Sequence, residues 1–164
     1  MNTVLKISTV LTWIILVVFG FIVFLGILAG LVSGNILLLI GSFLMASAIL
    51  HSYACLKLHR SIRRSNVPLG DHTPVGIRFI GFVVLFFGIC NVGNSIGILQ
   101  NTGEIIKMMQ PYWQGPKVSV ADQTSLLRGL AIFSLFLGLC MCVNVFLNFR
   151  LLRWYYLVKQ SDIS

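Results

Sequence analysis

Residues 10–32 read VLTWIILVVFGFIVFLGILAGLV and contain no charged side chain. A stretch of this length satisfies the roughly 20 apolar residues that an α-helix needs to cross a hydrocarbon core about 30 Å thick. It is longer than the apolar core of roughly 7–15 residues that is typical of a cleaved signal peptide. The stretch therefore predicts a retained membrane-spanning helix.

Three more apolar blocks follow, at residues 36–56, 79–99 and 129–149, and only Ser33-Gly34-Asn35 separates the first two blocks. The 164 residues are 57% hydrophobic and 10% charged, whereas about 25% of the residues in a soluble domain are charged. The mean hydropathy is +0.95. We expect an all-α protein with a single membrane domain over residues 1–164, folded as an antiparallel bundle of four spanning helices.

The charged residues predict the orientation of these spans. Loop 57–78 and the two ends of the chain carry nine of the Lys and Arg residues, whereas loop 100–128 carries three. Cytoplasmic segments of membrane proteins are enriched in these two residue types. The bias places both termini and loop 57–78 in the cytoplasm and loop 100–128 outside. We expect an integral protein of a bacterial cytoplasmic (inner) membrane.

Loop 57–78 is the most basic segment, and it has two interpretations. Its positive charges set the orientation of the spans, or they also dock a partner. Lys57, Arg60 and Arg64 recur at helical spacing, which predicts that the second span continues beyond the membrane as a short basic helix. Anionic headgroups attract such a segment by about 1 kcal/mol per cation near the surface. The candidate docking residues for lipid or protein are Lys57, Arg60, Arg63, Arg64, Arg78, Arg150 and Arg153.

The same loop carries a resemblance. Basic residues at a helix end, a turn with Pro68, and the sequence Arg78-Phe79-Ile80-Gly81 opening a third span resemble one bacterial family. That family comprises small four-span membrane proteins described only as a domain of unknown function. The resemblance covers about a fifth of the chain. It implies the four-span architecture and supplies no catalytic residue and no ligand.

The interior of the spans contains no Asp, Glu, Lys or Arg. Ion-coupled carriers need ionisable residues at this depth, so we do not expect a coupled transporter or a charge-conducting pore. Small polar residues do occur, at depths that match when each helix is measured at 1.5 Å per residue. Interhelical hydrogen bonds are one interpretation, and a ligand cavity is the other. This polar cluster consists of Asn91, Asn94, Ser95, Ser42 and Ser134.

Histidines and asparagines occur near the predicted cytoplasmic ends of the second and fourth spans. His51, Cys55 and His59 recur every four residues, but His51 and His59 are about 12 Å apart along a helix axis, and no carboxylate completes a metal site. Packing of His51 at the membrane edge is the preferred interpretation. Asn144 and Asn148, four residues apart on the fourth span, are expected to face water.

Further patterns predict local structure. Gly26-x-x-x-Gly30 and Gly93-x-x-x-Gly97 allow helices to approach closely, within the chain or between copies. Residues 104–110 are expected to form a short interfacial helix. Asp122 or Thr124 is expected to cap the fourth span.

The sequence favours a non-catalytic interaction protein, an accessory or regulatory subunit that docks through its basic cytoplasmic residues. The alternative is a lipid-handling or small neutral-molecule permeation protein that uses the polar cluster. An enzyme ranks third, because no phosphate-binding glycine loop, catalytic triad or complete metal-ligand set occurs. We expect no cofactor and no nucleic-acid partner. The expected partners are anionic lipid headgroups and a membrane or cytoplasmic protein.

Overall fold

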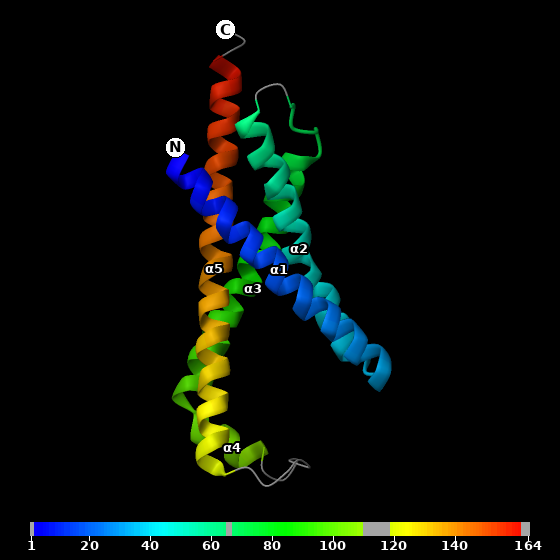
Figure 1. Cartoon of the computed structure of the whole chain (residues 1–164), viewed down its shortest axis with the longest axis vertical. Helices are drawn as coiled ribbons and strands as arrows, with labels where there is room; N and C mark the ends of the chain where they lie inside the picture. The colour runs from blue at the N-terminus through cyan, green and yellow to red at the C-terminus, as the bar shows by residue number, and fades with distance from the viewer. Residues whose placement is uncertain (1, 65–66, 110–118, 162–164) are drawn as a thin grey trace. The chain divides into compact units, whose positions relative to one another are not determined.

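The computed structural model describes residues 2–64, 67–109 and 119–161, which form five helices and no strand. The helices are α1 (Asn2–Ser33), α2 (Ile36–Arg63), α3 (Thr73–Gln100), α4 (Thr102–Met109) and α5 (Val120–Ser161) (Figure 1). Helices α1, α2, α3 and α5 are each long and apolar enough to cross a membrane. The all-helical class is thus confirmed, and so are four helices long and apolar enough to span a membrane. The short helix predicted at residues 104–110 is present as α4 over residues 104–109, and residue 110 lies outside the described residues.

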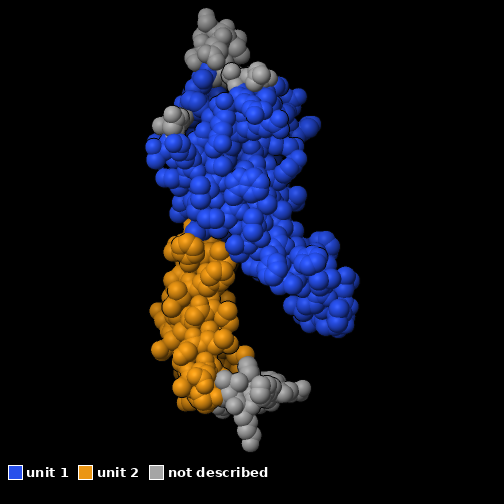
Figure 2. All heavy atoms as spheres, viewed as in Figure 1, with its two compact units in different colours: residues 1–85, 140–164 blue, residues 86–139 orange. Residues whose placement is uncertain are grey.

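Two compact units make up the chain (Figure 2). Unit 1 comprises residues 1–85 and 140–164, and unit 2 comprises residues 86–139. Unit 1 contains α1, α2, the first half of α3 and the second half of α5. Unit 2 contains the second half of α3, α4 and the first half of α5.

A two-residue turn reverses the chain between α1 and α2 in unit 1. Gly34 adopts a φ of +64°, a left-handed conformation that glycine reaches without the steric cost of a Cβ atom. Asn35 is the N-cap of α2, because its Oδ1 accepts hydrogen bonds from the backbone N–H groups of Leu37 (3.0 Å) and Leu38 (3.4 Å). The two helices therefore run antiparallel as a hairpin, as the short connection predicts.

Glycines on α1 allow α2 to lie close to it. A Cβ atom added at Gly30 would come within 2.7 Å of Leu39 Cδ2, and one added at Gly26 would collide with Ser42 Oγ. The first glycine motif therefore packs within the chain. Gly93 and Gly97 differ, since a Cβ atom added at either would meet nothing within 4 Å among the described residues.

Local sequence explains where α2 ends and where α3 and α5 begin. Helix α2 continues to Arg63, as expected from the basic helical spacing, and α3 begins at Thr73, directly before a proline that is tolerated in a first helical turn. The capping prediction for α5 was wrong in detail. Ser119 caps the helix by accepting from the backbone N–H of Asp122 at 3.1 Å, and its hydroxyl donates to the Asp122 carboxylate at 2.6 Å. A serine cap paired with an acidic residue three positions later satisfies free N–H groups at a helix start.

Large apolar side chains cover the outside of the long helices. Val32 is 89% exposed and Leu37 is 75% exposed, and many exposed Phe and Leu side chains accompany them. A water-soluble protein rarely exposes a continuous apolar surface of this extent. The exposed surface is consistent with helices that face lipid.

Candidate functional site: the basic end of unit 1

Four helices of unit 1 and the connection after α2 meet around an apolar cluster. Its buried residues come from α1, α2, the connection after α2, α3 and α5: Leu5, Cys55, Leu58, Leu69, Ile77, Leu151 and Leu152. The start of α1, the end of α2, the start of α3 and the last turns of α5 lie together here (Figure 1). We call this region the basic end, because the candidate docking residues Arg60, Arg63, Arg64, Arg78 and Arg153 belong to the same helix ends.

A buried polar network joins α1, α2 and α5 at the basic end. His59 Nε2 donates to Asn148 Oδ1 at 2.8 Å and lies 3.2 Å from Ser8 Oγ. Asn148 Nδ2 donates to the carbonyl oxygen (2.8 Å) and to Oδ1 (3.0 Å) of Asn144. Thr12 Oγ1 donates to the same Oδ1 at 3.0 Å. The network fixes three helices to one another by directional bonds.

The expectation that Asn144 and Asn148 face water was wrong. Their side chains are 1% and 0% exposed, respectively. Buried amides need hydrogen-bond partners, and α1 and α2 supply donors to the two side-chain oxygens through Thr12 and His59. Ser8 and Thr12 are four residues apart on α1, as the two asparagines are on α5. The matched spacing places each pair on one helix face, but spacing alone does not show which faces meet.

Three arginines at the end of α2, the last of them its C-cap, line a hollow of about 310 Å³ on the α1–α2 side of the basic end. We call it the α1–α2 hollow. Its lining consists of Thr9, Trp13, Leu56, His59, Arg60, Arg63 and Arg64. Arg63 Nη2 donates to Thr9 Oγ1 at 3.2 Å, and the Thr9 hydroxyl donates to the Leu5 carbonyl at 2.7 Å. The sequence singled out the three arginines and missed Thr9 and Trp13, which precede them by about 50 residues.

A second hollow, of about 430 Å³, lies between α3 and α5 within unit 1. We call it the α3–α5 hollow. Its lining consists of Arg78, Phe82, Phe149, Leu152, Arg153, Tyr156 and Leu157. Arg78 Cζ lies 5.9 Å from the centre of the Tyr156 ring, and the Phe82 and Phe149 ring centroids are 5.4 Å apart. The fold thus brings together two predicted docking residues that are 75 positions apart.

The other two predicted docking residues line neither hollow. Lys57 Nζ lies 4.7 Å from the centre of the Tyr53 ring on the same helix. Arg150 is exposed on α5. Both side chains add positive charge to the basic end.

The connection between α2 and α3 is tied to α5 through one tyrosine. The Tyr155 hydroxyl accepts from the backbone N–H of Leu69 and from Ser61 Oγ, each at 3.3 Å. Ser61 Oγ also lies 2.7 Å from the Val67 carbonyl oxygen. These bonds hold the connection against α5 at the basic end.

The polar cluster predicted in the third span is divided by the structure. Asn91 Nδ2 donates to the Ser134 carbonyl at 2.8 Å, and Ser134 Oγ donates to Asn91 Oδ1 at 2.7 Å, which joins α3 to α5 in unit 2. Ser95 is fully buried and donates to the Asn91 carbonyl at 2.7 Å. Asn94 is exposed, and Ser42 in unit 1 donates to the Leu38 carbonyl of its own helix at 2.8 Å. The Asn91–Ser134 pair is typical of interhelical hydrogen bonding.

His51 and Cys55 contact each other in the interior of unit 1. His51 Nε2 lies 3.4 Å from Cys55 Sγ, and a Cβ atom added at Gly81 would come within 3.0 Å of His51 Cε1. His51 is 1% exposed. The described residues contain no group of three or more His, Cys, Asp or Glu side chains placed to hold a metal ion. His51 therefore packs against α3, whereas His59 belongs to the polar network.

The chain was compared with protein-family models, curated proteins and solved structures, and none of the three comparisons found a match.

Proposed function

We propose that this chain is a non-catalytic accessory or regulatory subunit of a membrane assembly, which docks an acidic protein segment through its basic end. In this proposal the four spanning helices form an antiparallel bundle in a bacterial cytoplasmic membrane, with both termini inside. The excess of positive charge at the basic end supports this orientation through the positive-inside rule. The resemblance to small four-span bacterial proteins remains a prediction and agrees with it.

The observation that carries the proposal is the composition of the α3–α5 hollow. Arg78 and Arg153 stand beside Tyr156, and Phe82, Phe149, Leu152 and Leu157 complete its lining. Arginine and tyrosine are the residues that most often dominate binding energy at protein interfaces, where they lie in apolar surroundings. An acidic segment with one or two aromatic or aliphatic side chains complements this lining in charge and in polarity.

The rigidity of the basic end supports docking further. The buried network fixes α5 against α1 and α2, and Tyr155 fixes the connection that precedes α3. The hollow is therefore held in place before a partner arrives. A preformed surface loses less conformational entropy on association than a mobile one does.

Removing the two arginines of the hollow tests the docking proposal. The tagged protein would be purified from native membranes in mild detergent, and the copurifying proteins quantified by mass spectrometry. Arg78→Gln/Arg153→Gln should lower the recovery of a stoichiometric partner at least tenfold, because central interface residues contribute about 2 kcal/mol or more each.

The matched control is Lys107→Gln/Arg128→Gln, which removes two exposed cations of unit 2. This control should retain the partner. Equal recovery of the partner with both double variants would contradict the proposal.

The orientation has its own test. Fusion of a reporter that is active only outside the cytoplasm should give no signal at the C-terminus and a strong signal within residues 110–118. A fluorescent protein that matures in the cytoplasm should show the reverse pattern. The opposite result at either site would overturn the proposed orientation and leave the helical fold unaffected.

A further inference from the structure

We infer that the α1–α2 hollow is a binding site for one anionic phospholipid, whose phosphate group lies against the arginines of α2. This inference assigns a lipid ligand to one part of the basic end, and it rests on the membrane location in the proposed function. It does not require the protein partner. Its residues are also separate from those of the α3–α5 hollow.

The charge of the hollow suits a phosphate. Arg60, Arg63 and Arg64 are exposed guanidinium groups that line one cavity, and the lining contains no carboxylate. Only four acidic residues occur in the whole chain, and one of them, Asp71, lies in loop 57–78. Guanidinium groups bind phosphate through paired, charge-assisted hydrogen bonds.

Part of the site is already organised. Arg63 Nη2 donates to Thr9 Oγ1, and this oxygen also lies 3.4 Å from His59 Nδ1. His59 is 2% exposed and is held in turn by Asn148. The Thr9 hydroxyl thus holds the Arg63 side chain toward α1. Thr9 is in turn close to His59, which belongs to the buried network. A ligand that binds here does not need to order this arginine.

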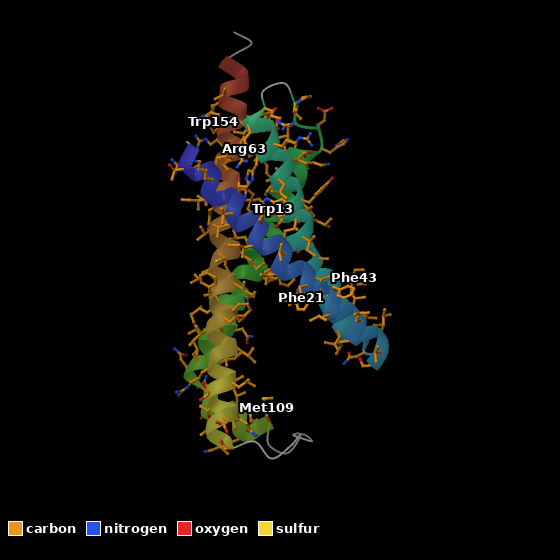
Figure 3. The ribbon with its side chains drawn as sticks, in the orientation of Figure 1. Trp13, Phe21, Phe43, Arg63, Met109 and Trp154 are labelled. Atoms are coloured by element: carbon orange, nitrogen blue, oxygen red, sulfur yellow. The ribbon has the colours of Figure 1, made fainter. Side chains whose placement is uncertain are left out.

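The rest of the lining selects a lipid over a soluble phosphate. Along α2, Leu56 precedes Arg63 by seven residues, which is about 10 Å. Along the antiparallel α1, Trp13 likewise lies further from the basic end than Thr9. Figure 3 labels Arg63 near the end of α2 and Trp13 part-way along α1. The hollow is therefore basic at one end and apolar at the other, like the ligand proposed for it.

An apolar stripe on α1 continues from the hollow in the direction expected of an acyl chain. Val10, Trp13, Val17 and Phe21 recur every three or four residues, so they share one face of the helix. They are 58%, 52%, 61% and 63% exposed, respectively. An acyl chain has about 0.8 kcal/mol to gain for each methylene group buried on such a surface.

Lipid titration of the purified protein in detergent, followed by native mass spectrometry, tests the inference. The probe is phosphatidylglycerol, with zwitterionic phosphatidylcholine as the reference lipid. Wild-type protein should bind one phosphatidylglycerol at least tenfold more tightly than phosphatidylcholine. Arg60→Gln/Arg63→Gln/Arg64→Gln should weaken that site by roughly 100-fold, since each cation near an anionic lipid is worth about fivefold.

Three further variants separate a defined site from general attraction. Arg78→Gln/Arg150→Gln/Arg153→Gln removes the same charge from the same end of unit 1 but outside the hollow, and it should leave the site within about threefold of wild type. Thr9→Val changes no charge and should weaken binding several-fold by releasing Arg63. Trp13→Ala should weaken phosphatidylglycerol binding without affecting any binding of inorganic phosphate.

Two outcomes would overturn the inference. Equal losses in the two triple variants would mean that phosphatidylglycerol follows the overall charge and not the hollow. Displacement of the lipid by millimolar inorganic phosphate, with no effect of Trp13→Ala, would identify a soluble phosphate site in its place. Because no partner protein is present, neither result bears on the docking proposal. Thermal unfolding of each variant is the control for the fold, and the substitutions should leave the unfolding temperature close to that of wild type.

Discussion

Asn148→Leu should reduce the free energy of unfolding by about 1–3 kcal/mol, the usual cost of leaving buried polar groups without partners. Asn148 accepts from His59 Nε2 and donates to two oxygens of Asn144. Leucine has a similar volume and fills the space, but it removes all three bonds and leaves His59 Nε2 with Ser8 Oγ at 3.2 Å in place of its shorter bond to Asn148. A single interhelical hydrogen bond in a membrane protein averages about 0.6 kcal/mol. A larger decrease in the free energy of unfolding would therefore show that several bonds of the network are lost together.

The measurement is equilibrium unfolding of the purified protein by a denaturing detergent. Asn94→Leu is the matched control, because Asn94 is exposed on α3 and takes no part in the network. It should change stability by no more than about 0.5 kcal/mol. If both substitutions changed stability equally, the buried network would not be stabilising unit 1. A double-mutant cycle of Thr12→Val with Asn148→Leu should give a coupling of at least about 0.5 kcal/mol, because the two side chains share Asn144 Oδ1.

Gly30→Leu should destabilise the α1–α2 hairpin by about 1–3 kcal/mol through overpacking. A Cβ atom at this position would stand 2.8 Å from Leu39 Cγ and 3.3 Å from the Leu39 backbone nitrogen. Rotation of the Leu39 side chain relieves the first contact but not the second. The two helices must therefore separate to admit the new side chain. Separation would also weaken the close approach of Gly26 to Ser42, one helical turn away.

Gly97→Leu is the matched control for this substitution, since a Cβ atom added at Gly97 meets nothing within 4 Å among the described residues. It removes a glycine from a helix interior, which favours the helix by about 0.8 kcal/mol. Gly97→Leu should therefore be neutral or stabilising in the same unfolding assay. Comparable losses from the two leucines would contradict the difference in packing between the two glycine motifs.

Local sequence predicted most features that depend on one helix alone, although it missed Ser119 as the cap of α5. The apolar blocks predicted four helices able to span a membrane, because the cost of exposing backbone groups to lipid leaves few alternatives to a helix. Ser33-Gly34-Asn35 predicted the tight turn, and the basic spacing after Leu56 predicted the continuation of α2 to Arg63. Each of these depends on residues within a few turns of one another.

The site required contacts that no local pattern contains. Spacing alone did not decide whether Asn144 and Asn148 face water or a neighbouring helix, and the answer lay in Thr12 and His59, more than 80 positions away. Likewise, the two glycine motifs look alike in the sequence, yet among the described residues Gly26 and Gly30 lie against another helix and Gly93 and Gly97 do not. An α-helix satisfies its own backbone, so the sequence by itself determined that four helices long and apolar enough to span a membrane form, although α1 and α5 extend well beyond the predicted blocks 10–32 and 129–149. Which faces meet is decided by the fit and hydrogen bonding of side chains from different helices, and only the tertiary structure decided that.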